Sequence, residues 1–126
     1  CTIASLGIGQ GEIQVTPLQM ANAVCLIANR GYYYTPHFVK SIDGETAEDT
    51  ILNKYRKKIT PLHIPDTSYQ AVINGMEMVV TNGTARNAKI EGFTVCAKTG
   101  TVENYFRKKK QQNHSFFIAF AKSLTH

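Results

Sequence analysis

The stretch FTVCAKTGT at residues 93–101 brings alternating apolar side chains up to a Lys-Thr-Gly-Thr sequence. A second apolar stretch, FFIAFA at residues 116–121, follows after a polar and basic interval. Two such runs separated by a polar interval predict a strand, a loop and a returning strand. The first strand then carries a lysine ammonium, two threonine hydroxyls and a glycine. Such a strand can hold a carboxylate and open its main-chain N–H groups to an oxyanion.

The tripeptide Lys98-Thr99-Gly100 is a weak signal when taken alone, because its residues are common ones. The simpler interpretation is an exposed lysine on an edge strand, where the charge discourages pairing with another sheet. The rest of the sequence has to decide between a binding site and this simpler role.

The composition is that of an ordinary globular sequence. Its 126 residues fit one domain or a part of one, and a hydrophobic content of 43% allows a packed core. No apolar run approaches the roughly 18–20 residues that a membrane span needs. The net charge of +5 permits anionic partners without requiring one. Because the first residue is Cys1 and no leader precedes it, we expect a segment of a longer protein.

The cysteines and histidines predict neither a disulfide framework nor a metal site. Three cysteines and four histidines are scattered without the spacing of metal ligands. Cys25 falls on the apolar face of a predicted helix and Cys96 lies within the first strand, so we expect both to be buried.

A helix with clear signals at both ends is predicted in the N-terminal part. Thr16 suits the cap, Pro17 suits the first helical position and Gly31 is typical of a helix stop. Apolar side chains at helical spacing between these residues form a face that we expect to be buried. Residues 32–42 follow as a predicted strand.

A second helix is predicted after a polar segment. Residues 45–65 are expected to be irregular, and the helix begins near Asp66, which serves as its cap. It ends at the helix-stop pair Asn82-Gly83. Helices combined with an antiparallel strand pair indicate an α+β fold, an antiparallel sheet with helices packed on it.

Two features are compatible with phosphate binding, and both have simpler interpretations. The glycines at residues 7, 9 and 11 lack the Gly-Lys-Ser/Thr ending of a P-loop and favour a close-packed loop. The basic clusters at residues 54–58 and 107–110 are short and typical of solvated loops or hairpins. We therefore expect no nucleic-acid partner.

Blocks of sequence from residue 3 to about residue 121 resemble the class B penicillin-binding proteins in their order and spacing. The elongation-type branch, penicillin-binding protein 2, is the most similar subgroup. The blocks are IGQGEIQVTPLQMANA at residues 8–23, Gly75-Met76 with Val79-Val80 and Gly83-Thr84-Ala85, KTGT at residues 98–101, and HSFFIAFA at residues 114–121.

The resemblance implies a D,D-transpeptidase that cross-links peptidoglycan stem peptides through a serine acyl-enzyme. β-Lactams mimic the D-Ala-D-Ala end of the stem peptide and trap that intermediate. The resemblance implies no cofactor and no metal. It also implies a parent protein that is anchored in the bacterial inner membrane, acts on its periplasmic face and belongs to a cell-wall synthesis complex.

By position, the resemblance implies a role for each residue of the Lys-Thr-Gly-Thr sequence. Lys98 would supply positive potential and bond to the serine of a second family motif. Thr99 and Thr101 would bind the terminal carboxylate of substrate or β-lactam, and Gly100 would let the strand lie close to it. The main-chain N–H of Thr101 would be one of the two oxyanion donors.

The sequence departs from the family pattern in the nucleophile. The family's Ser-x-x-Lys and Ser/Tyr-x-Asn motifs do not occur in residues 1–126, and residues 122–126 do not resemble the family's continuation. We therefore expect residues 1–126 to be the C-terminal part of a transpeptidase domain of the β-lactamase-like fold, inactive on its own. The alternatives are a penicillin-recognising sensor domain without turnover and a β-lactamase.

Strand alternation raises a difficulty for the implied roles. Residues two apart on a strand share a face, so Thr99 and Thr101 should point one way and Lys98 the other. We therefore expect either a twist or bulge near Gly100 or a lysine that reaches the site along the strand edge.

Overall fold

The computed structural model describes residues 14–42, 50–61, 63–103, 105–106, 109–110 and 112–124. The glycine-rich loop around residues 7–11 and part of the basic cluster, residues 107–108, lie outside these ranges. The helices are α2 (Pro17–Ala28), α3 (Thr50–Arg56), α4 (Asp66–Thr81) and the 3-10 turn η1 (Arg86–Ala88). The strands are β1 (Phe93–Val102), β2 (Tyr105–Phe106), β3 (Lys109–Lys110) and β4 (His114–Ser123).

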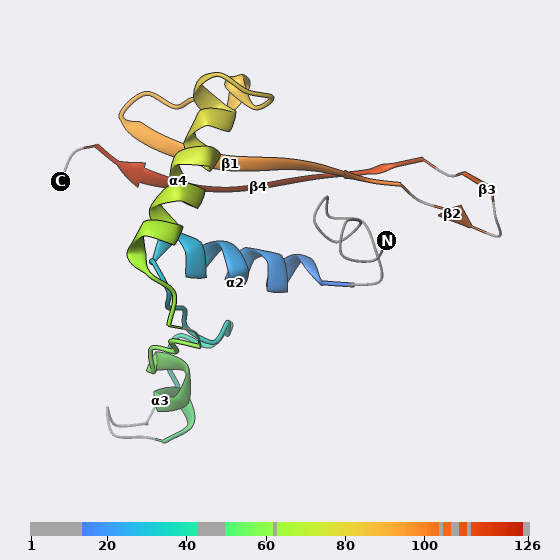
Figure 1. Ribbon diagram of the computed structural model, residues 1–126. Coiled ribbons are helices and arrows are strands. Elements are labelled where there is room, and N and C mark those ends of the chain that lie inside the picture. The colour runs from blue at the N-terminus through green and yellow to red at the C-terminus, as the bar shows by residue number, and fades with distance from the viewer. Residues whose placement is uncertain are drawn as a thin grey trace.

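The strand, loop and returning strand expected from the sequence are confirmed. β1 and β4 pair antiparallel over their full lengths, from Phe93 opposite Ser123 to Val102 opposite His114. The short strands β2 and β3 also pair antiparallel, near the tip of the same hairpin (Figure 1). β4 extends beyond the predicted residues 116–121 at both ends. Helices packed on an antiparallel strand pair give the α+β class that the sequence indicated.

The core lies where α4 crosses β1, near the end of the hairpin that is distant from its tip (Figure 1). Val80 of α4 packs there with Ala85, which follows the helix, and with Val95 and Ala97 of β1. Ala97 is fully buried. Because small side chains meet on both sides of this contact, the helix end and the strand approach closely.

α2 begins as the sequence predicted. Thr16 and Gln19 form a reciprocal capping box, and Pro17 occupies the first helical position. The last helical residue is Ala28, and the predicted stop at Gly31 is confirmed. Gly31 closes the C-terminal turn, with a φ of +112° and an N–H that donates to the carbonyl of Leu26 at 2.9 Å.

α4 differs slightly from its prediction at the N-terminus. Pro65 precedes the helix, and no side-chain cap bond is formed there. Asp66 is therefore the first helical residue and not the cap, and its carboxylate accepts from the Arg30 guanidinium at 2.8 Å. The predicted end at Asn82-Gly83 is confirmed, since the helix ends at Thr81 and Asn82 caps it.

The segment between α2 and α4 contradicts two expectations. Residues 32–42 do not form a strand. Their β-type pairing is a single isolated bridge, in which Tyr33 pairs antiparallel with Ile59. Residues 45–65 are not wholly irregular, because they contain α3. In place of a longer ladder the segment makes a side-chain contact with α3, where His37 stacks on Tyr55 with ring centroids 4.9 Å apart.

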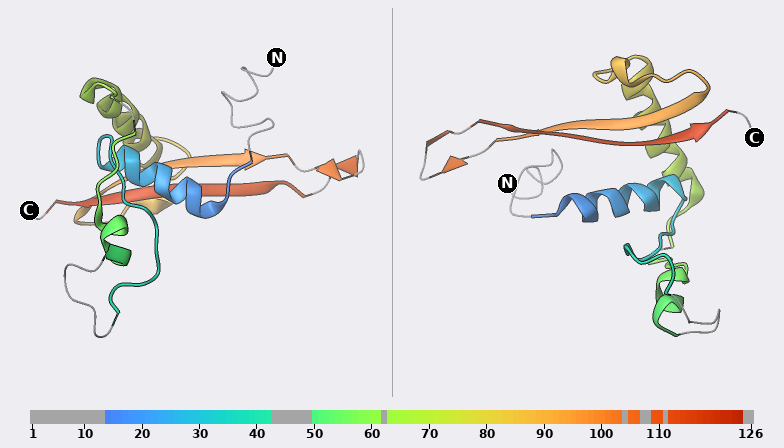
Figure 2. Two further views of the ribbon diagram at one scale, coloured as in Figure 1. Left: turned by 90° about the horizontal axis from the view of Figure 1, so that it is seen from below. Right: turned by 180° about the vertical axis from the view of Figure 1, so that it is seen from behind.

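The two described cysteines differ in burial. Cys96 is 2% exposed, as expected. Cys25 is exposed, and its expected burial is wrong. The reason is a groove of about 380 Å³ between α2 and β4, lined by apolar α2 side chains that include Cys25 and by residues 116–120. Figure 2 shows α2 running alongside the strand pair in both views, so its apolar face lines an open groove instead of a closed core.

Within the described residues, every helix is too short or too polar to cross a membrane.

Candidate functional site

The Lys-Thr-Gly-Thr sequence lies in the second half of β1, in regular pairing with β4. Lys98 stands opposite Ile118, and Gly100 stands opposite Phe116. The pairing runs one to one through the whole strand, so the bulge expected near Gly100 is not present. A Cβ atom built on Gly100 would meet nothing within 4 Å. The space beside Gly100 is therefore open to a ligand.

The two faces of β1 have different surroundings. Thr99 and Thr101 share a face with the buried residues Val95 and Ala97, which pack against the end of α4. Lys98 belongs to the opposite face, and the alternation that the sequence predicted is therefore real. The two hydroxyls and the ammonium start from opposite sides of the strand.

The ammonium group of Lys98 nevertheless reaches the main chain of Thr99. Its Nζ atom donates a hydrogen bond to the main-chain carbonyl oxygen of Thr99 at 2.5 Å. The long side chain therefore folds along the strand edge, which is the other arrangement that alternation allows. The ammonium and the main chain of Thr99 come together in this way without any distortion of the strand.

A residue to which the sequence analysis gave no role completes this group. The Oγ1 atoms of Thr84 and Thr99 lie 2.9 Å apart and form a hydrogen bond. Thr84 belongs to the Gly-Thr-Ala sequence that follows α4. In the sequence, Thr84 was noticed only as a member of this block, which resembles the family, and no role was predicted for it. Nothing in a one-dimensional pattern shows that this turn touches β1, because the contact joins residues separated by 15 positions.

The turn that carries Thr84 is held firmly. A Cβ atom at Gly83 would lie 2.8 Å from the Cα of Val79, so only glycine allows this close approach. The N–H of Ala85 donates to the carbonyl of Val79 at 3.0 Å, and the Ala85 side chain is buried in the core. Thr84 is thus fixed between two anchored neighbours.

Cys96 lies near the site, and a cysteine thiolate is a strong nucleophile. The surroundings of Cys96, however, keep its thiol protonated and unreactive. Burial raises the pKa of the Cys96 thiol, and the negative charge of Glu77 raises it further. A buried thiol with a raised pKa stays protonated near neutral pH, and the protonated form is a poor nucleophile. These residues therefore include an ammonium and hydroxyl groups, which are able to bind an anion, and no activated nucleophile.

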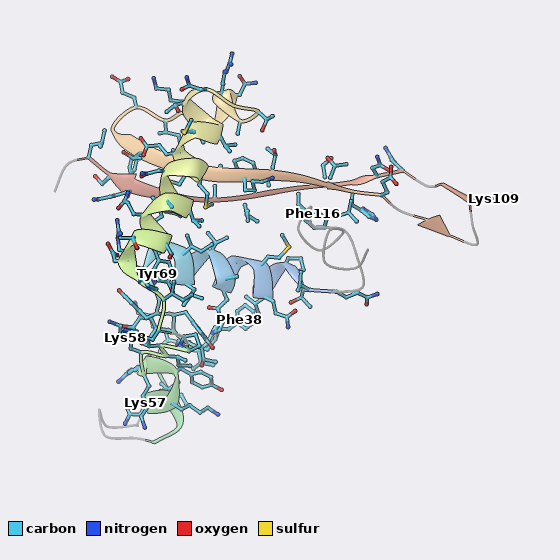
Figure 3. All side chains as sticks on the ribbon, in the orientation of Figure 1. Phe38, Lys57, Lys58, Tyr69, Lys109 and Phe116 are labelled. Atoms are coloured by element: carbon cyan, nitrogen blue, oxygen red, sulfur yellow. The ribbon has the colours of Figure 1, made fainter. Side chains whose placement is uncertain are left out.

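The basic clusters do not form one surface. Figure 3 shows Lys57 and Lys58 beside α3, whereas Lys109 lies at the far tip of the hairpin. Lys58 and Lys54 place their ammonium groups over the rings of Tyr32 and Tyr55, at 3.8 and 4.7 Å from the ring centroids. Residues 54–56 belong to α3, so this part of the cluster is helical and not the loop or hairpin that the sequence indicated, and Lys54 and Lys58 contact rings within the chain.

The sequence matches the family model described as the penicillin binding protein transpeptidase domain over residues 2–126. It is 33% identical to the peptidoglycan D,D-transpeptidase MrdA of Haemophilus influenzae, over 93% of this chain and 20% of that protein. It is 35% identical to the stage V sporulation protein D of Bacillus subtilis, over 94% of this chain and 18% of that protein. It is 30% identical to the peptidoglycan D,D-transpeptidase PbpA of Mycolicibacterium smegmatis, over 94% of this chain and 24% of that protein.

The chain thus spans about a fifth of the length of these curated relatives. The family match, by contrast, covers nearly all of its own residues and includes β1 with its Lys-Thr-Gly-Thr sequence. The chain belongs to the penicillin-binding protein transpeptidase domain family.

Proposed function

We propose that this chain forms the part of a peptidoglycan D,D-transpeptidase that binds the D-Ala-D-Ala end of a stem peptide, and β-lactams in the same place. The observation that carries the proposal is the meeting of the Lys98 ammonium with Thr99 at one edge of β1. Hydrogen bonds between charged groups and a carboxylate are among the stronger ones in proteins. Relatives named peptidoglycan D,D-transpeptidases support the assignment.

Each residue of the Lys-Thr-Gly-Thr sequence has a role in this proposal. Lys98 supplies positive potential for the substrate carboxylate. The hydroxyls of Thr99 and Thr101 donate to that carboxylate, since a carboxylate only accepts. Gly100, with open space beside it, allows the ligand to lie against the strand. None of these groups requires a cofactor or a metal ion.

The strand edge also provides for the oxyanion. The Thr99 carbonyl that accepts from Lys98 faces away from β4, and main-chain groups two residues apart on a strand point the same way. The N–H of Thr101 therefore opens onto the same edge, where it can donate to the oxyanion of the tetrahedral intermediate. Removal of one such donor in another hydrolase costs about 2.7–4 kcal/mol of transition-state stabilisation.

The serine that attacks the amide has to come from outside residues 1–126, because no Ser-x-x-Lys occurs in them. We therefore propose that residues 1–126 are the C-terminal part of a transpeptidase domain and are inactive alone. The whole protein would be anchored in the inner membrane with this domain on the periplasmic face, in a complex for cell-wall synthesis.

The experiment is penicillin acylation of the full-length protein that contains this chain. Lys98→Ala should slow acylation at least tenfold, while the matched change Lys122→Ala, an exposed lysine near the end of β4, should not. Both variants should unfold within about ±0.5 kcal/mol of the unmodified protein. Equal acylation rates for the two variants would mean that Lys98 is only an edge lysine.

Turnover then separates the alternatives. Formation of a cross-linked product when an amine acceptor is added supports the transpeptidase. Rapid release of hydrolysed penicillin indicates a β-lactamase, and a stable adduct without acceptor-dependent turnover indicates a sensor domain.

A further inference from the structure

We propose that Thr84 is a positioning residue for the substrate carboxylate, acting through the hydroxyl of Thr99. This inference rests on the proposed function, because it assumes that Thr99 binds that carboxylate. It adds a residue outside the Lys-Thr-Gly-Thr sequence to the binding site. The observation behind it is the 2.9 Å contact between the two Oγ1 atoms.

The direction of the hydrogen bonds follows from what each group is able to do. A hydroxyl has one hydrogen to donate, and an ionised carboxylate only accepts. When Thr99 donates its hydrogen to a carboxylate, that hydrogen is no longer available to Thr84. Thr84 must then be the donor in the pair, and the chain of bonds runs from Thr84 to Thr99 to the ligand.

Such a chain assists binding in two ways. Without Thr84, the Thr99 hydroxyl is free to rotate, and ordering it costs rotational entropy when the ligand binds. Donation from Thr84 also polarises the Thr99 hydroxyl and strengthens the hydrogen bond that it makes in turn. Both effects are preorganisation, so Thr84 contributes without touching the ligand.

The anchoring of the turn makes this role specific to Thr84. Gly83 packs against the main chain of Val79, and Ala85 is buried and bonded to the same residue. The turn therefore cannot swing away when the site is empty. Thr84 itself remains exposed, so its hydroxyl has no other structural task among the contacts described for it.

The test measures the second-order rate constant of acylation by benzylpenicillin in the full-length protein. Thr84→Val keeps the shape of the side chain and removes its hydroxyl, and acylation should fall about two- to tenfold, as expected for one neutral hydrogen bond. Thr84→Ser restores the hydroxyl and should bring the rate back to within twofold of the unmodified protein. Thr81→Val is the matched control, because the Thr81 hydroxyl donates to the helix carbonyl of Glu77 at 3.2 Å and is not bonded to Thr99.

A double-mutant cycle with Thr99→Val tests the route of the effect. If Thr84 acts through Thr99, the double variant should be no slower than Thr99→Val alone. If the two effects instead add, or if Thr84→Val acylates at the unmodified rate, the positioning role is wrong. If Thr99→Val itself acylates normally, the failure belongs to the proposed function and not to this inference alone.

A second substrate distinguishes a specific effect of Thr84→Val on carboxylate binding from general damage to the fold. The methyl ester of benzylpenicillin has no free carboxylate, so Thr84→Val and the unmodified protein should react with it at equal rates. A variant with a damaged fold would be slower with both compounds, and that result would overturn a specific role for Thr84.

Discussion

The ring of Tyr69 covers Gly31 so closely that a Cβ atom at residue 31 would lie 3.1 Å from the Tyr69 hydroxyl oxygen. This contact joins the turn after α2 to the first turns of α4, beside the ion pair of Arg30 and Asp66. The packing of Tyr69 on Gly31 and the ion pair of Arg30 with Asp66 together join the two helices that pack on the strand pair.

Gly31→Ala should destabilise the protein. The φ of +112° at Gly31 is one that L side chains rarely adopt, and the new methyl group would press on Tyr69. Left-handed backbone alone costs roughly 1–2 kcal/mol for a residue with a Cβ atom. Urea unfolding should show at least this loss. Gly75→Ala is the control, because a Cβ atom there meets nothing within 4 Å and should be neutral or stabilising.

Tyr69→Phe should leave the stability unchanged or raise it by about 1 kcal/mol. The Tyr69 hydroxyl is buried and has no hydrogen-bond partner among the described residues. Removing it relieves a desolvation cost and leaves the packing of the ring intact. A loss of more than about 1 kcal/mol in thermal unfolding would show that the hydroxyl has a bonding partner in solution.

The chain of 126 residues alone should form no covalent adduct with a penicillin. The Ser-x-x-Lys motif that carries the nucleophilic serine is absent from its sequence. Denaturing mass spectrometry after incubation with a fluorescent penicillin measures this directly. A stoichiometric adduct on any serine would contradict the proposal that the nucleophile lies elsewhere.

Thr99→Val and Thr101→Val should each weaken acylation of the full-length protein by about 1.5–3 kcal/mol, the size of a lost hydrogen bond to a charged group. Both changes keep the β-branched shape that suits a strand, so β1 should persist. If each variant acylates within twofold of the unmodified protein, the threonines do not bind the carboxylate.

Cys96 should make stability depend on pH at the alkaline end. Burial first, and the charge of Glu77 second, raise the pKa of its thiol in the folded state above the ordinary value of 9.0. The folded state therefore binds the proton more tightly than the unfolded state does. Its contribution to stability is complete below about pH 9 and is lost as the pH rises through the folded-state pKa. Unfolding curves of Cys96→Ala should lack this alkaline decline.

The parts of the fold that were predictable are those with local signals. Thr16 and Pro17 mark the start of α2, and Asn82-Gly83 marks the end of α4, because caps act within one turn of chain. The strand pair was predictable from two apolar runs. The Lys-Thr-Gly-Thr sequence was found in the same way, since its residues are consecutive.

The parts that were missed depend on contacts across the chain. The segment at residues 32–42 has the residues of a strand, yet it finds ring partners on α3 and only one ladder contact. Cys25 lies on an apolar helix face, yet that face lines an open groove. The bond between Thr84 and Thr99 and the folding of Lys98 along its strand are likewise tertiary. Periodicity reports which face is apolar, but not what covers it.

The continuous apolar run in β4 affects the solubility of this chain. Phe116 and Phe117 point to opposite faces of the strand and remain 39% and 54% exposed. From residue 116 to residue 121 the sequence has neither a charge nor a proline. Stretches of this kind are templates for amyloid-like stacking when they stay uncovered. Lys122 follows the run and is the first charged residue that interrupts it. Solubility therefore depends on how soon after synthesis the other residues of β4 are covered by neighbouring parts of the protein.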